Sequence, residues 1–279
     1  MKHYMLILAT LLSLLIPMKS LGQINMKKYV EGIVALATGD YKTAFIEFKK
    51  LAEQEQDTIA LLYLAELWAN EHDNDEKGVP KDFEKAIKLR TLLAEKGHPT
   101  AQLKLAQMYH DGRGVLQDYK IAIKWYTLAA EQGMTNAQLN LGLMYRDGTG
   151  VLQDYKTALK WFTLAAKQED SLAQGNLGYM YQEGLGVLQD YKTALKWYTL
   201  SAEQGDVEAQ FNLGTMYYFG QGTLKDNVYA HMWYNISSSN GNENGAKLRN
   251  IIAEIMTSTQ LKNAQKLAKE CVAKNYKGC

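Results

Sequence analysis

The sequence predicts an all-α fold, a right-handed superhelical solenoid of helix-turn-helix repeats with a 36-residue period. Two observations carry this prediction. The heptapeptide GVLQDYK occurs three times, at Gly114, Gly150 and Gly186, each copy 36 residues after the one before. Apolar residues between the copies recur with helical spacing. A fixed period of this length is the signature of a repeat architecture, in which neighbouring units stack to bury their apolar faces.

The first predicted helix of each unit follows an aspartate. Apolar residues stand four, seven, eight, eleven and twelve positions after it, and these offsets share one face of an α-helix. The tryptophans at the seventh position are Trp125, Trp161, Trp197 and Trp233. The aspartates are Asp82, Asp118, Asp154, Asp190 and Asp226. An aspartate at a helix start accepts hydrogen bonds from free backbone amides, so we expect these residues to be N-caps.

A second amphipathic helix follows in each unit, with Ala137, Leu141 and Met144 on its apolar face in one copy. A short connection joins the two helices. The glycines at matching places in it are Gly97, Gly133, Gly205 and Gly241. Glycine is usual where a helix ends in the left-handed conformation. Glu169 occupies this place in one unit, so we expect that turn to be either strained or built differently.

The chain is expected to divide into four parts. Residues 1–22 read as a secretory signal peptide, with an apolar run from Met5 to Met18 and small residues before the expected cleavage point. A membrane anchor is the weaker alternative, because spanning a bilayer takes about 20 residues. Residues 23–81 form a degenerate repeat with an insertion of six residues near 70–77. Residues 82–225 hold four regular helix-pair repeats.

Residues 226–279 form the last part, a terminal repeat and a C-terminal capping helix. We expect the regular second helix to be lost there and a polar helix to run from Ser258 to Ala273. Cys271 and Cys279 are expected to form a disulfide in an oxidising compartment. Free thiols are the alternative. No metal or cofactor is expected.

The charge balance argues against two kinds of partner. Removing Lys2 and Lys19 with the signal peptide leaves 29 basic and 30 acidic side chains. A nearly neutral chain has no global field to attract nucleic acid or an anionic membrane, so neither is expected to bind the mature form. Gln23 stands where a lipoprotein would need cysteine. We therefore expect a soluble exported monomer that is not a lipoprotein.

The segment AQLNLGLMYRDGTGVLQDYKTALKWFTLAA resembles the Sel1-like repeat family, relatives of the tetratricopeptide repeats. The resemblance extends over roughly residues 30–260, and STQLKNAQKLAKEC is similar to the helix that often closes such arrays. It implies a scaffold or adaptor that binds a protein or peptide partner in a groove and holds no cofactor. It also implies an exported bacterial protein, so the periplasm is the expected location.

An enzyme is not expected, although the family leaves one alternative open. Cysteine-rich members are linked to penicillin binding and β-lactam hydrolysis, but here the regular units lack cysteine. The sequence contains no Ser-x-x-Lys, no His-Glu-x-x-His and no Gly-x-x-x-x-Gly-Lys. The alternative function is therefore an envelope enzyme acting on β-lactams or peptidoglycan fragments.

Two rows of polar residues are candidates for partner binding. Lysines on the first helices lie opposite the tryptophan stripe, where they would line a concave groove and hold carboxylates of the partner. These are chiefly Lys124, Lys160 and Lys196. A solvated face is the alternative. Asn140, Asn176 and Asn212 recur on the second helices and would pair with an extended peptide backbone. The alternative is that they tie helix to helix.

GVLQDYK itself is interpreted as scaffold. Its glycine ends one helix, its valine and leucine are expected to cover the seam, and its aspartate caps the next helix. On this interpretation the heptapeptide is the joint between units. Partner choice should then depend on residues that vary between copies.

Overall fold

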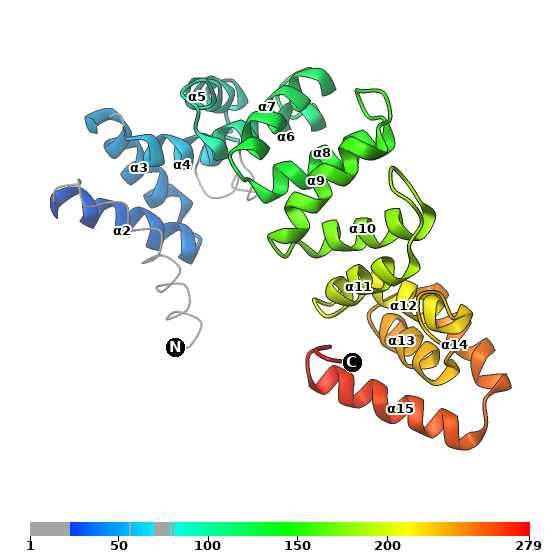
Figure 1. Ribbon diagram of the computed structural model, residues 1–279. Coiled ribbons are helices and arrows are strands. Elements are labelled where there is room, and N and C mark those ends of the chain that lie inside the picture. The colour runs from blue at the N-terminus through cyan, green and yellow to red at the C-terminus, as the bar shows by residue number, and fades with distance from the viewer. Residues whose placement is uncertain (1–22, 56, 70–78, 80) are drawn as a thin grey trace. The chain divides into compact units, whose positions relative to one another are not determined.

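The computed structural model describes residues 23–55, 57–69, 79 and 81–279. Over these residues the chain forms fourteen α-helices (Figure 1). They divide into two compact units, of which the first ends at Leu116 and the second begins at Gln117. None of the described helices combines the length and apolarity that a membrane crossing needs. The predicted signal peptide, 1–22, and the predicted insertion, 70–77, lie outside the described residues.

The described part of the first unit contains five helices, of which the first four contribute to one apolar core. They are α2 (Gln23–Thr38), α3 (Tyr41–Glu55), α4 (Thr58–Trp68), α5 (Phe83–Glu95) and α6 (Pro99–Asp111). Phe48, Leu51 and Leu64 are almost fully buried in this core. The Asp40 side chain accepts a hydrogen bond from the backbone of Thr43 at 3.1 Å, so α3 begins with an aspartate cap like the first helices of the regular units.

The second unit contains nine helices, of which the first eight pack in sequence order and the last packs back on the seventh (Figure 1). They are α7 (Tyr119–Glu131), α8 (Thr135–Asp147), α9 (Tyr155–Lys167), α10 (Ser171–Glu183), α11 (Tyr191–Ala202), α12 (Val207–Phe219), α13 (Asn227–Ser239), α14 (Glu243–Ile255) and α15 (Ser258–Ala273). The all-α fold and its 36-residue period are confirmed. Successive helices alternate between a short turn and a longer loop, so each helix has two kinds of neighbour.

The predicted helix faces and caps are confirmed. Trp125, Trp161 and Trp233 are buried, whereas Trp197 is half-buried. The Asp118 side chain accepts hydrogen bonds from the backbone amides of Lys120 and Ile121 at the start of α7. Each of the other four predicted aspartates caps its helix in the same way.

Helices joined by the longer loop approach very closely, and glycine permits this. A Cβ atom on Gly178 in α10 would lie 2.6 Å from the Tyr198 ring in α11. Gly142 meets Phe162 and Gly214 meets Tyr234 in the same way. We call α8 with α9, α10 with α11 and α12 with α13 the loop-linked pairs. Their contact is more extensive than that between helices joined by the short turn.

A chain of side-chain amides links the short turns, and sequence reasoning missed it. Buried Gln138 donates to the Ala130 carbonyl at 3.0 Å and accepts from Gln168 of the next turn at 2.8 Å. The same bonds recur one and two repeats later. Gln204 donates to Gln174, and Asn240 donates to Gln210, both at 2.9 Å. The signal was available, because glutamine follows the buried alanine of the second helix in each of these units.

Glu169 has the strained version of the turn. Its φ angle is 64°, against 88° for Gly133 and 90° for Gly205 at the equivalent places. The turn is thus built in the same way as its neighbours, with a side chain in a region that favours glycine.

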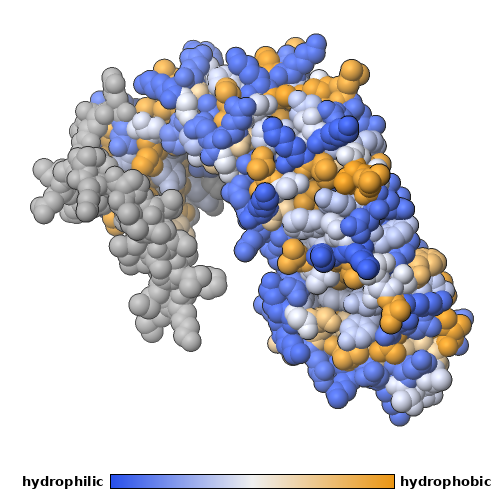
Figure 2. Space-filling model, viewed as in Figure 1, coloured by the Kyte–Doolittle hydropathy of each residue, from blue (hydrophilic) through white to orange (hydrophobic). Residues whose placement is uncertain are grey.

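The leucines of the repeated heptapeptide do not cover a seam, which corrects the sequence-based interpretation. Leu116, Leu152 and Leu188 are 91%, 92% and 88% exposed. Figure 2 shows hydrophobic residues gathered in separate groups among hydrophilic ones on the visible face. The glycine of the heptapeptide does not end the helix either, since the C-cap of α8 is Gly148 and not Gly150. Gly150 has a packing role instead, because a Cβ on it would lie 2.3 Å from the Cβ of Tyr119. The loop therefore presses its backbone against the start of an earlier helix.

The C-terminal part keeps a helix that we expected to be lost. Helix α14 has the length and spacing of a regular second helix, although only Gly245 and Ile252 are buried in it. The polar helix predicted from Ser258 to Ala273 is confirmed as α15, which packs on α13. A disulfide joins Cys271 to Cys279.

The tail enclosed by this disulfide contacts the preceding repeat. The Gly278 amide donates to a Glu203 carboxylate oxygen at 2.8 Å. The hydroxyl of Tyr276 lies within hydrogen-bond distance of the Asn240 side chain. The disulfide thus holds a short tail against the last turns of the array.

Candidate binding site

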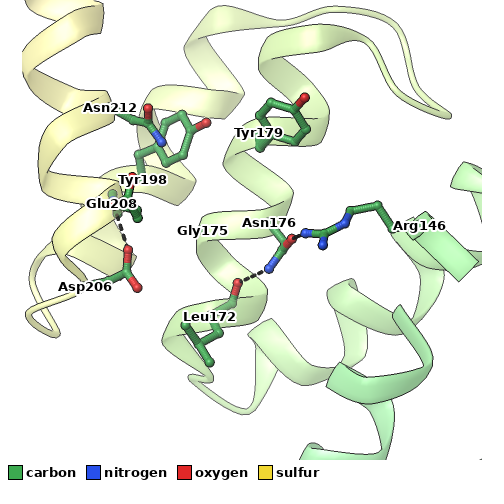
Figure 3. A pocket seen from close by; sticks show the side chains of 10 residues that line it. Arg146, Leu172, Gly175, Asn176, Tyr179, Tyr198, Asp206, Glu208 and Asn212 are labelled. Atoms are coloured by element: carbon green, nitrogen blue, oxygen red, sulfur yellow. Dashed lines mark hydrogen bonds between the residues drawn. The ribbon is translucent and has the colours of Figure 1, made fainter. Parts of the chain in front are cut away.

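The three predicted asparagines, Asn140, Asn176 and Asn212, lie on helices α8, α10 and α12. We call these three side chains the asparagine row. Helix α10 contacts both α8 and α12 directly, so the row forms one continuous surface in the second unit. A cavity of about 290 Å³ lies on this surface, and both Asn176 and Asn212 line it. Figure 3 shows its side chains coming from α8, α10, α11 and the start of α12.

The cavity lies where one repeat lacks a large side chain. Gly175 lines it, whereas the equivalent residues one repeat before and after are Leu139 and Phe211. A Cβ on Gly175 would have the Ser201 hydroxyl as its nearest neighbour, at 3.3 Å. The hollow therefore exists only where glycine replaces the large apolar side chain of the neighbouring repeats.

Arg146 closes one side of the cavity, and its charge is already paired. Its Nε donates to Asp147 Oδ1 at 2.7 Å and a terminal nitrogen donates to Asp147 Oδ2 at 2.9 Å. The other terminal nitrogen donates to Asn176 Oδ1. The Asp147 carboxylate raises the pKa of the Arg146 guanidinium. This side of the cavity has its main hydrogen bonds satisfied within the protein.

Two carboxylates from the start of α12 form the opposite side (Figure 3). Asp206 is the N-cap and accepts from the Ala209 amide at 2.7 Å. Glu208 accepts from the Asn242 side chain at 3.0 Å. Neither carboxylate forms an ion pair with a residue in the described part of the chain. Burial raises the pKa of Asp206, and hydrogen bonds from the Ala209 and Glu208 amides only partly offset this.

Tyrosine side chains form the wall between these two sides. Tyr198 is 1% exposed, and its hydroxyl has no hydrogen-bond partner among the described residues. In the next repeat the equivalent Tyr234 hydroxyl lies 3.0 Å from Thr215 Oγ1. Tyr179 stands where Thr215 would be and is 46% exposed beside the cavity. A buried hydroxyl that a neighbouring repeat satisfies is therefore left unsatisfied here.

The asparagines differ in how much of their hydrogen bonding is used. Asn140 donates to the Asn136 carbonyl at 2.7 Å on its own helix. Asn176 donates to the Leu172 carbonyl at 2.8 Å and also accepts from Arg146, so it links α10 to α8. The Asn212 side chain forms no hydrogen bond within the described part of the chain, which leaves its amide available at the cavity.

The predicted lysines lie on the other row of helices, α7, α9 and α11, and none of them lines this cavity. Lys124 and Lys160 lie over the neighbouring Trp125 and Trp161 rings, with Nζ 5.1 and 4.9 Å from the ring centroids. Lys196 borders a separate, largely apolar depression of about 440 Å³ on α11. The cavity contacts the asparagine row instead of the lysine row.

Sequence reasoning missed several cavity residues, namely Arg146, Gly175, Tyr179 and Glu208. Each occupies a repeat position where its counterparts differ. For example, Tyr179 replaces Leu143 and Thr215. A search for variable positions beside the asparagines would have found them.

Five consecutive segments match the pattern of the Sel1 repeat, residues 58–98, 99–134, 135–170, 171–206 and 207–242. The chain belongs to the Sel1 repeat family. Each Sel1 repeat in the second unit contains one loop-linked pair. The heptapeptide GVLQDYK therefore lies inside a Sel1 repeat. The sequence-based prediction began each unit at an aspartate and so placed the heptapeptide between units. The turn with the amide chain is the boundary between Sel1 repeats.

Two solved structures show the same Sel1 architecture. One is a protective antigen present in uropathogenic Escherichia coli strains, 34% identical with a TM-score of 0.73, and the match covers 84% of this chain. The chain spans only 50% of that antigen's length. The other is a Sel1 repeat protein from Oxalobacter formigenes, 29% identical with a TM-score of 0.67, covering 86% of this chain and 98% of that one. No curated protein sequence matches the chain.

Proposed function

We propose that this Sel1 repeat protein is an exported scaffold that binds an extended segment of a protein partner along the asparagine row. The observation that carries the proposal is the cavity between Asn176 and Asn212. The free Asn212 amide offers both a donor and an acceptor, which suits a peptide backbone. A helical-repeat surface of this kind presents many polar groups along an extended line.

Two features support export to the bacterial periplasm. The sequence of residues 1–22 has the features of a cleaved signal peptide. The disulfide between Cys271 and Cys279 is typical of proteins that fold in an oxidising compartment. N-terminal sequencing of the protein recovered from the host envelope should begin at Gln23. Recovery of the unprocessed chain from the cytoplasm would contradict export.

Site-specific photocrosslinking tests where the partner binds. A photoreactive residue at Tyr179, exposed beside the cavity, should give one discrete adduct in living host cells. The same residue at Lys160 reports on the lysine row, and at Lys266, exposed on α15, it reports on a surface outside both rows. An adduct only at Lys160 would transfer the binding site to the lysine row. Equal adducts at all three positions, or none, would contradict the proposal.

A pair of asparagine variants provides the matched control. Asn212→Ala should weaken adduct formation at Tyr179 without lowering the melting temperature, because the Asn212 side chain holds no bond in the fold. Asn263→Ala should leave the adduct unchanged, because Asn263 is exposed on α15, outside the asparagine row. Equal effects of both substitutions would show that the cavity is not the site.

The alternative of an envelope enzyme acting on β-lactams or peptidoglycan fragments has no specific observation in its favour. The polar groups around the cavity are asparagine, tyrosine, arginine and carboxylate side chains. Turnover of a chromogenic cephalosporin by the purified protein would revive this alternative.

A further inference from the structure

We infer that the cavity between α10 and α12 binds a basic side chain, lysine or arginine, of the protein segment that the asparagine row binds. This inference rests on the proposed function and names the residue that anchors the partner. It differs from the expectation drawn from the lysine row, which would select acidic partners.

The charges around the cavity favour a cation. Arg146 is neutralised by two hydrogen bonds to Asp147, so it contributes little net positive charge. Asp206 and Glu208 contribute two negative charges without a cation from the described residues beside them. The N-terminus of α12 carries roughly half a positive charge, which two carboxylates outweigh. The net field at this side of the cavity is therefore negative.

The unused hydrogen-bonding groups also suit an ammonium or guanidinium group. Such groups are donors only, so they need acceptors. The carboxylates of Asp206 and Glu208 and the Oδ1 atom of Asn212 are acceptors at the cavity. The unsatisfied Tyr198 hydroxyl in its wall also has acceptor capacity. A polar group of the partner at this place would give Tyr198 the hydrogen bond that Tyr234 shares with Thr215 one repeat later.

The apolar part of the cavity suits the stem of a long basic side chain. Leu172 and Ala209 line it together with Gly175, which leaves space beside the α10 backbone. Exposed Tyr179 presents an aromatic ring at the same surface. Lysine and arginine place their methylene stems on apolar surface and their charge near aromatic faces. A carboxylate side chain would find no unpaired cation here.

Titration with small probes tests this inference on the full mature chain. The probes are Nα-acetyl-lysine-N-methylamide, its arginine counterpart, the uncharged norleucine isostere and the glutamate analogue. The readout is the NMR shift of the Asn212 side-chain amide. Lysine and arginine probes should produce saturable shifts and bind at least about fivefold more tightly than norleucine. Norleucine binding as tightly as lysine, or glutamate binding more tightly, would overturn the inference.

Variants that preserve the fold identify the groups responsible. Asp206→Asn keeps a helix cap, because asparagine caps as well as aspartate does. Glu208→Gln keeps an oxygen for Asn242. Each should weaken lysine-probe binding about fivefold or more by removing a charge. Glu131 is exposed at the end of α7, so Glu131→Gln should leave lysine-probe binding unchanged. Equal weakening by all three variants would show only a general charge effect.

Gly175→Leu fills the hollow with the residue that the previous repeat carries at this place, Leu139, so the fold has a precedent for it. Circular dichroism and the melting temperature check folding, and lysine-probe binding should be lost. Binding retained by folded Gly175→Leu would place the site elsewhere and overturn the inference.

The probe and crosslinking results separate the two proposals. Adducts at Tyr179 without a response to lysine or arginine would keep the scaffold and overturn the basic anchor. Lysine binding without adducts would overturn the scaffold and leave a site for a small basic ligand. Failure of both would overturn both.

Discussion

The two interfaces of each helix are built from different chemistry. Loop-linked pairs, such as α10 with α11, are held by close apolar contact between a glycine and an aromatic ring. Helices joined by the short turn, such as α9 with α10, are linked at the turn by an amide donor on the second helix, because Gln174 on α10 donates to the Ala166 carbonyl on α9 at 3.4 Å. The comparison teaches that each Sel1 repeat is held together by a glycine–aromatic contact and by a bond between side-chain amides, such as Gln168 with Gln138. Neighbouring repeats are joined at the turn by amide-to-carbonyl bonds, such as Gln138 to Ala130.

Gly178→Ala is expected to produce the largest effect, because it disrupts a loop-linked pair. The added Cβ would lie 2.6 Å from the Tyr198 ring, and overpacking of this kind costs about 1–3 kcal/mol. Improved helix propensity returns up to about 1 kcal/mol. A separation of 2.6 Å places the cost at the upper end of this range or above it, so we expect urea unfolding to show a net loss of about 2 kcal/mol or more.

Gly175→Ala is the matched control on the same helix. Its nearest neighbour would be 3.3 Å away, so we expect a change between zero and a gain of about 1 kcal/mol. Similar effects of the two alanines would mean that glycine is not what allows the helices to approach.

Gln138→Ala tests the turn interface. It removes the donor to the Ala130 carbonyl and the acceptor for Gln168, in a buried place. A buried group left unsatisfied costs about 1–3 kcal/mol, so we expect a loss of about 2 kcal/mol.

A double-mutant cycle with Gln168→Ala isolates the bond between the two side chains. The coupling energy should be about 1 kcal/mol. Strictly additive effects would show that the bond between Gln138 and Gln168 does not stabilise the Sel1 repeat that contains both residues.

Glu169→Gly sharpens the comparison by improving a turn. Glycine removes the left-handed strain of glutamate at φ 64°, while it increases the entropy of the unfolded chain. The expected net gain is about 1 kcal/mol in thermal or urea unfolding. Gly133→Ala should cause a loss of similar size, since nothing lies within 4 Å of its added Cβ and only backbone strain changes. An unchanged free energy of unfolding in Glu169→Gly would contradict the inference that Glu169 is strained.

Asp154→Asn should produce the smallest effect, visible as pH dependence at the loop. The Thr157 hydroxyl and amide hold the pKa of the Asp154 carboxyl below its usual value. A carboxyl whose pKa is lower in the folded than in the unfolded chain stabilises the protein above the unfolded pKa. This stabilisation is lost as the pH falls through the folded pKa. Between about pH 5 and pH 3, the wild type should therefore lose more stability than Asp154→Asn. Parallel losses would show that the cap charge does not matter.

Periodicity predicted the fold in detail, because it reports burial directly. The offsets of Trp125 and its equivalents, the aspartate caps and the turn glycines follow from helix geometry alone. The amide chain was missed because a glutamine such as Gln138 has no periodic apolar signature, so its burial depends on the partner that the next repeat provides. Leu152 was expected to be buried because it is apolar, but it is exposed. An apolar residue in a loop has no helical periodicity that would indicate whether another element packs on it.

The candidate site was less predictable than the fold. The asparagines recur in the three copies that begin at Thr135, Ser171 and Val207, so sequence alone indicated the row but not where along it a cavity lies. That place depends on Gly175, where an absent side chain creates space, and on Glu208, which only the stacking of α12 beside α10 brings near Asn176. Such effects depend on differences between repeats in contact.

The identical loops make the length of the array adjustable. Excision of residues 151–186 joins Gly150 to Val187 and regenerates GVLQDYK at the new junction. Gly142 would then face Tyr198 in place of Phe162, and Gln204 would donate to Gln138 in place of Gln168. Every link would find a chemically equivalent partner, while α10 and its cavity would be gone. The number of repeats can thus change independently of how each is joined, which makes this protein modular in the genetic sense as well as the structural one.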